Sequence, residues 1–541
     1  MSLKNVFFTF IYLWYIIILG NLTIQESKSK RRGLMAHLSA QCSLCLEETP
    51  LETSSFISKR GKSVDVNRRI VYHSIETGGG YEGLASFCSI MNMPCIMKTA
   101  YYQHVETILD ALELEAENDM KQAGQRLRQH ILGENGDGDS DEVVDAAVSF
   151  DGTWAKRGFT SLTGVVFVIS VDTGEVVDYH VLSKACQSCA VKEARCKSEE
   201  EFEEWQMEHV ASGDCDVNFR GSSPAMEAEG AAVLWNRSVE RHNIRYKWMV
   251  CDGDSKAFNT VENTYPDCKV VKLDCVGHVQ KRMGKHLLNL KARTKGKLAD
   301  GKSIGGRGRL SDDKIKQIQR YYGLAIRQNT LSNPNPSERE VNVAVYTMKK
   351  NIIAILHHSV KADDPAKQHR YCPPGEKSWC KWQQDLATAT STYNGDDCLP
   401  EVFLELLRPT FMALSETKLL ERCVLGATQN RNECINSLVW IRCPKHKHHG
   451  VKVIRCGVAS AVLHFHSGAA SRERVMKRLS IPAGKFTKRA SLSRDKKRVY
   501  KSDLQATTKE KKHRQAEDQR KTRQEAALRD VDGNSYEAGA F

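Results

Sequence analysis

The sequence predicts an α/β fold in which helices cover a mixed β-sheet, and three observations support this. Three consecutive segments, 143–150, 161–170 and 175–183, are rich in Val, Ile, Phe and Tyr and are separated by turn residues, which indicates three antiparallel strands. Helical and strand patterns alternate further along the chain. At 541 residues with 41% hydrophobic content, the chain is long enough for a large core and for two or three folded units.

Each later element of the predicted sheet follows from its pattern and length. A helix is expected at 224–242, strands at 246–251 and 269–273, and a further helix at 277–291. Strands in a row, followed by alternating helices and strands, are typical of a mixed sheet with helices on its faces. The first part of this core is therefore expected to span 141–292.

A helical insertion interrupts the predicted core. From 293 to 414 the pattern is helical and irregular, and a last core helix is expected at 416–440 within a closing core segment at 415–466. The remaining residues, 467–541, are mostly charged and are expected to form a basic, partly helical tail.

A small module is expected at 41–140, ahead of the core. It closes with a helix whose apolar residues recur at helical spacing, which predicts packing against the rest of the module. These residues are Val105, Ile108, Leu112 and Ala116.

Residues 1–40 are expected to combine a hydrophobic segment with a linker. The apolar run 7–20, FFTFIYLWYIIILG, precedes a polar, basic stretch at 21–40. The run has the length of a signal-peptide hydrophobic region and is short for a membrane span. If genuine, it predicts secretion or membrane anchoring, whereas the intracellular character of the remaining sequence equally favours a misassigned first exon.

Positive charge is in excess and unevenly distributed. Lys and Arg outnumber Asp and Glu by 79 to 66, giving a net charge of +13, which is compatible with a nucleic-acid partner. A Gly/Arg loop with Arg307 and Arg309, before a helix start at Ser311, is expected to follow a DNA phosphate backbone, and Lys285 and Lys302 add charge. A solvated basic loop is the alternative interpretation.

Two acidic residues occupy the expected ends of strands. Asp151 follows the apolar run VVDAAVSF, and Asp252 follows YKWMVC. Both precede Gly, which allows a sharp turn and leaves a carboxylate accessible. Two-metal nucleases need carboxylates from distant parts of the chain, so this pair is a candidate Mg²⁺ or Mn²⁺ site. Asp-Gly is also a common turn dipeptide, and Asp254 competes with Asp252 for the second position.

Cysteines are numerous, and their spacing favours metal ligation over disulfides. Among the 18 Cys, Cys186 and Cys189 form a Cys-x-x-Cys pair, and His209 with Cys215 supplies a second pair after a polar stretch. Four such ligands suit a tetrahedral structural Zn²⁺ site, with Cys196 as an alternative ligand. Unpaired thiols in a loop are the other interpretation.

Two further groups of cysteines are weaker candidates for metal binding. His369, Cys372 and Cys380 lie close together in the sequence, with Cys398 available as a fourth ligand. Cys42 and Cys45 form a third half-site that has no obvious second half, although Cys88 and Cys95 lie downstream.

Six motifs of the sequence closely resemble the Mutator-like transposase domain found in many animal genomes. They are FDGTWAKRG, GSSPAMEAEG, YKWMVCDGDSKAF, KLDCVGHVQKRMGKHL, HRYCPPGEKSWCKW and LGATQNRNECINSLVW. The similarity covers roughly residues 42–465. It implies an RNase H-like core in which two Asp and one Glu hold divalent metal ions, with a helical insertion before the Glu.

Carried over residue by residue, the resemblance assigns the three acids. Asp151 and Asp252 become the first two, and Glu433 becomes the third. Helix periodicity alone does not favour Glu433 over Glu416 or Glu421.

The resemblance also covers a Cys-x-x-His motif shortly after the second acid. Cys275 and His278 match this motif. His278 is therefore expected to position DNA or a hydrogen-bonded carboxylate, with a structural histidine at a helix start as the alternative.

The function that the resemblance implies is that of a DNA transposase of the two-Asp-one-Glu type. Such a protein cleaves and joins double-stranded DNA at transposon ends and target, uses Mg²⁺ or Mn²⁺, and acts in the nucleus as a homo-oligomer. A domesticated nuclear DNA-binding protein that no longer cuts is the alternative. A secreted Cys-rich protein is a third hypothesis, based only on residues 7–20.

Overall fold

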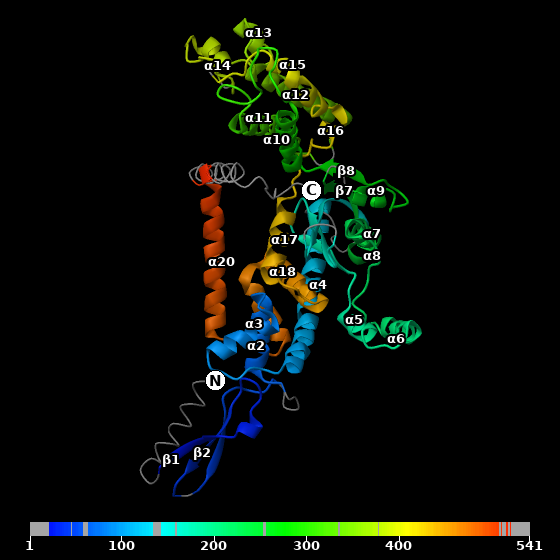
Figure 1. Ribbon diagram of the computed structural model, residues 1–541, viewed down its shortest axis with the longest axis vertical. Coiled ribbons are helices and arrows are strands. Elements are labelled where there is room, and N and C mark those ends of the chain that lie inside the picture. Colours follow the sequence, from blue (N-terminus) through cyan, green and yellow to red (C-terminus); the bar gives the residue numbers. More distant parts are fainter. Residues whose placement is uncertain are drawn as a thin grey trace. The chain divides into compact units, whose positions relative to one another are not determined.

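The computed structural model describes residues 21–44, 46–57, 63–133, 142–156, 160–252, 256–333, 336–376, 378–395 and 397–507, together with 510, 516, 517 and 520. The chain forms two compact units, one from residues 1–116 and 458–541 and the other from residues 117–457 (Figure 1). The hydrophobic run at 7–20, Cys45 and Asp254 lie outside the described residues. Within the described ranges, no helix is long and apolar enough to cross a membrane.

The first unit begins with a three-stranded antiparallel sheet. Its strands are β1 (Leu22–Glu26), β2 (His37–Cys42) and β3 (Glu48–Glu52), in that order. The interpretation of 21–40 as a linker is therefore wrong. Side chains of this sheet are mostly polar and few are buried, so backbone pairing, which composition does not reveal, holds the strands together.

Helices complete the first unit. The predicted apolar stripe on α4 is confirmed, since Val105, Ile108, Leu112 and Ala116 are all buried. The helices are α2 (Asp65–Glu76), α3 (Gly80–Ile90), the first part of α4 (Lys98–Leu132), most of α18 (Val451–Ser467), α19 (Ser471–Arg478) and α20 (Lys485–Ala506).

Part of the predicted basic tail is folded into this unit through ion pairs. Arg472 binds Glu76 on α2 at 2.6 Å, and Arg474 binds Glu115 on α4 at 2.7 Å. Arg478 also binds Glu115, which is buried. These arginines therefore neutralise carboxylates of the unit and are not a purely solvated charge run.

The second unit contains a five-stranded mixed sheet. The predicted row of three antiparallel strands is confirmed, and two parallel strands extend the sheet from β4. In sheet order the strands are β6 (Val176–Ser183), β5 (Thr163–Ser170), β4 (Val144–Trp154), β7 (Ile244–Cys251) and β8 (Val271–Asp274). Because β4 lies in the centre, its side chains have neighbours on both sides.

An aromatic group anchors one face of this sheet to its helices. Trp235 on α7 (Met226–Asn236) packs edge-on against Phe150 and Tyr246, with ring centroids 5.6 and 5.3 Å away, and all three side chains are fully buried. Its indole nitrogen donates to the Tyr246 carbonyl at 3.0 Å. This arrangement fixes α7 over β4, the strand that carries Asp151.

The helix predicted at 224–242 is interrupted. It forms α7 and α8 (Ser238–His242), which meet at Arg237, and α9 (Lys256–Val261) follows β7. The Arg237 guanidinium binds the buried carboxylate of Asp178 on β6 at 2.7 Å, an interaction between distant parts of the chain that local periodicity does not reveal.

The insertion after α10 (Val276–Arg293) is helical, as predicted, and has its own apolar core. Its helices are α11 (Asp312–Arg327), α12 (Glu338–Ser359), α13 (Pro365–His369), α14 (Lys381–Thr388) and α15 (Phe403–Ala413). Helix α11 begins as expected, with the Ser311 side chain accepting from the Lys314 backbone N–H.

The single helix predicted at 416–440 is wrong. Two helices, α16 (Thr417–Glu421) and α17 (Asn430–Arg442), are separated by a loop. Residues 422–425 of this loop form turns, and the loop bonds to the segment that leads from β8 into α10: the Asp274 N–H donates to the Arg422 carbonyl at 2.9 Å, and the Val276 N–H donates to the Ala427 carbonyl at 3.0 Å. These bonds bring α17 beside α10, although about 150 residues separate the two helices in sequence.

Candidate active site and two cysteine–histidine clusters

Asp151 lies within the central strand, not at its end as expected. Strand β4 continues to Trp154, and Asp151 pairs with Phe167 of β5. Gly152 does not form a turn; a side chain there would lie 3.4 Å from Glu227 Cγ and 3.1 Å from the Trp154 ring. A Cβ at this position would crowd the Trp154 ring by a few tenths of an ångström, so close packing beside Asp151, and not backbone conformation, favours glycine here.

Asp252 directly follows β7, as predicted, and the strand register brings it to the level of Asp151. Strands β4 and β7 are parallel, and Ser149 pairs with Val250. Both acids lie two residues beyond this pair, so they are level with each other on neighbouring strands. The structure therefore brings the two predicted acids together.

His278, in the first turn of α10, contacts the second acid. Its Nδ1 lies 2.5 Å from Asp252 Oδ1 and 3.0 Å from Gln429 Oε1. The hydrogen bond to Asp252, helped by one to Cys275, raises the pKa of His278 to about 10, so the imidazole is charged at neutral pH. Burial opposes ionisation of Asp252, but the charged His278 brings the pKa of Asp252 below its ordinary value.

A row of polar side chains on and just before α17 runs along β4. Gln429 Nε2 donates to the Phe150 carbonyl at 2.8 Å, and Asn432 accepts from Ser149 Oγ at 2.6 Å. One turn later Asn436 Nδ2 donates to Asp151 Oδ2 at 2.8 Å. The spacing of three to four residues is that of one helix face, so the row fixes both the register of α17 and the orientation of Asp151.

Glu433 lies on the same helix, three residues before Asn436. Its carboxylate is 3.9 Å from Lys281 Nζ, and its side chain is 58% exposed. Lys281 lies three residues after His278, on the same face of α10. His278 contacts Asp252, and Lys281, one turn later, lies near Glu433. Glu433 thus lies on the helix that binds Asp151 through Asn436, and it is within ion-pair distance of α10, the helix that contacts Asp252.

A further acid, Glu227 on α7, was missed from the sequence. Burial, together with the charge of Asp252, raises the pKa of Glu227 to about 7. Burial and the charges of Glu227 and Asp252 raise the pKa of Asp151 to about 8, although Asn436 and His278 oppose the shift. The only sequence signal for Glu227 is its place in the motif GSSPAMEAEG, which has no spacing relation to the other acids.

The first cysteine–histidine cluster contains the four residues that the spacing predicted. Sγ of Cys186 lies 3.3 Å from His209 Nε2, and Sγ of Cys189 lies 3.6 Å from Cys215 Sγ. All four ligand atoms are within 4.8 Å of one another. Cys196, the alternative ligand, is not in the cluster.

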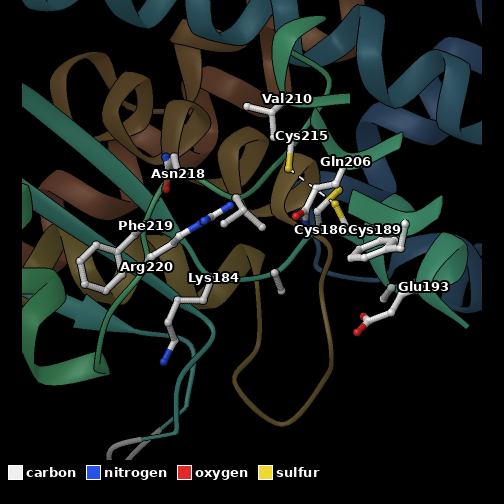
Figure 2. A pocket seen from close by; sticks show the side chains of 14 residues that line it. Lys184, Cys186, Cys189, Glu193, Gln206, Val210, Cys215, Asn218, Phe219 and Arg220 are labelled. Carbon is white, nitrogen blue, oxygen red and sulfur yellow. Dashed lines mark hydrogen bonds between the residues drawn. The ribbon is translucent and has the colours of Figure 1, made fainter. Parts of the chain in front are cut away.

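Helices α5 (Gln187–Glu193) and α6 (Glu199–Ala211) hold this cluster at the wall of an open pocket (Figure 2). Burial by itself raises the pKa of Cys186, but backbone N–H groups and the His209 ring lower it to about 6, which favours the thiolate that binds metal. Among the cysteines in the described part of the chain, none forms a disulfide.

A second cluster lies in the helical insertion. It contains His369, Cys372 and Cys380, as the weaker prediction proposed, but its fourth member is His358. Expecting Cys398 as fourth ligand was therefore wrong. His358 is on α12, eleven residues before His369, and no short motif marked it. Both clusters have the composition and closeness of a site for a metal ion such as zinc.

The structure exposes three of the four basic residues expected to contact DNA and buries the fourth. Lys285, Lys302 and Arg307 are exposed. Arg309, in contrast, is only 7% exposed, binds Asp300 and lies over the Phe403 ring at 4.9 Å. Its guanidinium stabilises the loop from inside, so the expectation of a DNA phosphate contact by Arg309 is corrected.

Comparison with models of known protein families identifies the family of this chain. A model of the family described as Mutator-like transposase matches residues 18–380, more than half of the chain. The matched part contains Asp151, Asp252, His278 and both cysteine–histidine clusters, and it ends before Glu433. No curated protein matches the chain. The match thus covers the strands of the two aspartates and the Cys-rich part of the insertion. This chain belongs to the Mutator-like transposase family.

Proposed function

We propose that this chain is a metal-dependent DNA transposase in which Asp151, Asp252 and Glu433 hold Mg²⁺ or Mn²⁺. The observation that carries the proposal is the placement of Asp151 and Asp252 at the same level of neighbouring parallel strands, with Glu433 on α17, the helix whose Asn436 binds Asp151. Family membership supports transposase chemistry in general, and the placement of the acids supports these residues as its centre.

The donor set fits a hard divalent cation. Burial and the charge of Asp252 raise the pKa of both Asp151 and Glu227, so a cation among these carboxylates removes an electrostatic cost. Oxygen ligands are those that Mg²⁺ and Mn²⁺ prefer. When bound, such ions supply Lewis acidity that activates a nucleophilic oxygen and stabilises charge on the scissile phosphate.

The chain's own residues position these ligands. Asn436 orients one oxygen of Asp151, and the charged His278 keeps Asp252 ionised while Gln429 fixes the imidazole. Lys281 lies 3.9 Å from Glu433, and a bound cation would compete with it for this carboxylate. His278 is thus a positioning residue for the second acid.

The fold expected from the resemblance is RNase H-like, and we extend the proposal to it. Its support is the strand order, with three consecutive antiparallel strands, two parallel strands beyond the central β4, and the first acid on β4. The helical insertion lies between α10 and α17 in sequence, although Lys281 of α10 and Glu433 of α17 are only 3.9 Å apart.

The remaining parts of the proposal concern binding. Lys285, Lys302 and Arg307 are exposed cations on α10 and the following loop, suited to double-stranded DNA at transposon ends and target. Cys186, Cys189, His209 and Cys215 are proposed to bind structural Zn²⁺. Acting on chromosomal DNA requires a nuclear location, and pairing of two transposon ends requires a homo-oligomer.

Cleavage of transposon-end DNA by the full chain tests the proposal. Asp151→Asn, Asp252→Asn and Glu433→Gln should each lower cleavage in Mg²⁺ by about 100- to 1,000-fold, because each removes a charge that acts in the transition state. Glu416→Gln, an exposed acid before α16, is the matched control and should cut normally. Undiminished cleavage by the Asp151 and Glu433 variants would exclude the assignment.

DNA binding is measured separately. Replacing Lys285, Lys302 or Arg307 by Gln should weaken binding to all DNA sequences. Each replacement should also reduce the slope of log affinity against log salt concentration by about one. DNA binding by the wild-type chain without cleavage in Mg²⁺ or Mn²⁺ would instead support a domesticated DNA-binding protein.

A further inference from the structure

The segment between α12 and α15 has almost no apolar core. In the described part of residues 361–398, the buried side chains are Gln368, His369, Cys372, Ser378 and Cys380, none of them aliphatic or aromatic. Helix α14 buries no residue at all. Apolar burial is the usual force that orders a segment of this length, so something else must hold it in place.

The second cysteine–histidine cluster lies where those buried side chains meet. His358 comes from α12, His369 from the end of α13, and Cys372 and Cys380 from the loop between α13 and α14. The cluster therefore links the segment to α12, which belongs to the apolar core of the insertion.

The distances between its ligand atoms are those of a tetrahedron around zinc. With zinc–ligand bonds of ordinary length, tetrahedral ligands lie about 3.3 Å apart for two nitrogens and about 3.6 Å apart for nitrogen and sulfur. The two Nδ1 atoms of His358 and His369 are 3.2 Å apart. Cys372 Sγ lies 3.7 and 3.8 Å from them, and Cys380 Sγ lies 3.4 Å from His369 Nδ1.

Cys398, although close by, has other partners. Its sulfur accepts from Gln368 Nε2 at 3.2 Å, contacts the Tyr393 hydroxyl at 3.5 Å and donates to the His358 carbonyl at 3.5 Å. Cys398 thus supports the backbone of one ligand and is not itself among the four.

The surroundings fix the ligands and close the site. Trp382 stacks on the His369 ring at 5.2 Å, and Trp379 meets the His358 ring edge-on at 4.9 Å. Gln383 Nε2 donates to the His369 carbonyl at 3.1 Å. Four protein ligands leave no open position for substrate, which is the pattern of structural and not catalytic zinc.

We propose that His358, His369, Cys372 and Cys380 form a second structural zinc site, which holds residues 361–398 onto α12. The proposal does not depend on DNA cleavage. With the first cluster, it gives two zinc ions per chain, one with three thiolates and one with two.

Zinc content of the full-length chain, purified in excess Mg²⁺ to keep zinc off the carboxylates, tests the proposal. Wild-type protein should contain two zinc ions, and a Cys372→Ala/Cys380→Ala variant should contain one. Cys398→Ser is the matched control, because it removes a neighbouring thiol outside the cluster, and it should retain two. Trypsin should cut the double variant at Arg370 or Lys381, both exposed, while the Cys398→Ser variant resists.

A second measurement uses a variant in which all four residues of the proposed site are intact. In a Cys189→Ala chain, which lacks the first site, added Co²⁺ should give a spectrum with charge-transfer intensity for two thiolates. Two zinc ions in the double variant, no Co²⁺ binding in the Cys189→Ala chain, or a Cys372–Cys380 disulfide in the wild-type protein would each overturn the proposal.

Discussion

The five-stranded sheet and the two cysteine–histidine segments hold their candidate metal ligands in opposite ways. The sheet places Asp151 above a core of fully buried aromatic residues, among them Phe150, Trp235 and Tyr246. The segments 184–218 and 361–398 bury almost no side chains except those of the metal-binding clusters and a few polar neighbours. In the sheet, an apolar core stabilises the fold that positions the candidate ligands. In the two segments, the candidate ligands themselves make up most of the buried side chains.

This difference explains which sequence signals were informative. Runs rich in Val, Ile, Phe and Tyr between turn residues predicted the first three strands, because such side chains pack well on a covered sheet. Cys-x-x-Cys spacing predicted the first cluster, because two ligands on one short turn must approach the same ion. Neither signal reports which distant residue completes a site.

The largest expected effect comes from removing zinc at the first cluster. Structural zinc contributes about 10 kcal/mol of apparent binding free energy in small zinc-finger peptides, and little else orders α5 and α6. Cys189→Ala should therefore make residues 190–211 sensitive to trypsin, while far-UV circular dichroism retains the sheet signal. Cys196→Ala is the control and should behave as wild type; protection of the segment in the Cys189→Ala chain would mean that the segment is held by something else.

Next in size is the loss of a core aromatic residue. Phe150→Ala should destabilise the second unit by about 3–5 kcal/mol, because it leaves a cavity against Trp235. Zinc content should remain at the wild-type level in the folded fraction. Tyr346→Ala, an exposed aromatic on α12, should change stability by less than about 0.5 kcal/mol in the same urea titration. Equal effects of the two substitutions would contradict a sheet stabilised by apolar burial.

Asn436→Ala should have a moderate effect that is confined to the acidic site. The lost hydrogen bond to Asp151 involves a charged group and is worth about 1.5–3 kcal/mol, so cleavage should fall by about tenfold or more. Because this bond lowers the pKa of Asp151, the deficit should shrink as pH rises from 7 toward 9. Ser437→Ala, the exposed next residue, should leave the pH profile of cleavage unchanged. A deficit that is equal at every pH would point to a structural role for Asn436.

The last expected effect is on stability against pH. The pKa of Asp151 is about 8 in the fold and 3.8 in the unfolded chain, so between these values the folded state binds the extra proton. Stability of the metal-free protein should therefore fall as pH rises from 4 to 8, and Mg²⁺ should restore it. Asp151→Asn should raise the metal-free melting temperature at pH 8 by about 2–4 °C for each kcal/mol of relieved repulsion. Glu227→Gln should act in the same direction, because it removes a charge that opposes ionisation of Asp151. A melting temperature of the metal-free wild type that rises between pH 5 and 8 would contradict this sign.

The sequence by itself determined the local parts of this protein. Apolar periodicity gave the five strands of the large sheet and the helical insertion, and residue spacing gave the four ligands of the first cluster. The resemblance of six motifs to Mutator-like transposases gave the family, which the match over residues 18–380 confirmed. These features depend on neighbours along the chain, where side-chain pattern and backbone conformation are directly coupled.

Only the tertiary structure decided which distant side chains meet. It placed Asp151 inside β4 and Arg309 inside the insertion, and it added Glu227 and His358 to sites that the sequence had left incomplete. It also divided the predicted 416–440 helix, because the loop before α17 bonds to residues that lie about 150 positions earlier. Such contacts follow from strand register, helix packing and burial, which are set by the whole fold, so no local pattern encodes them.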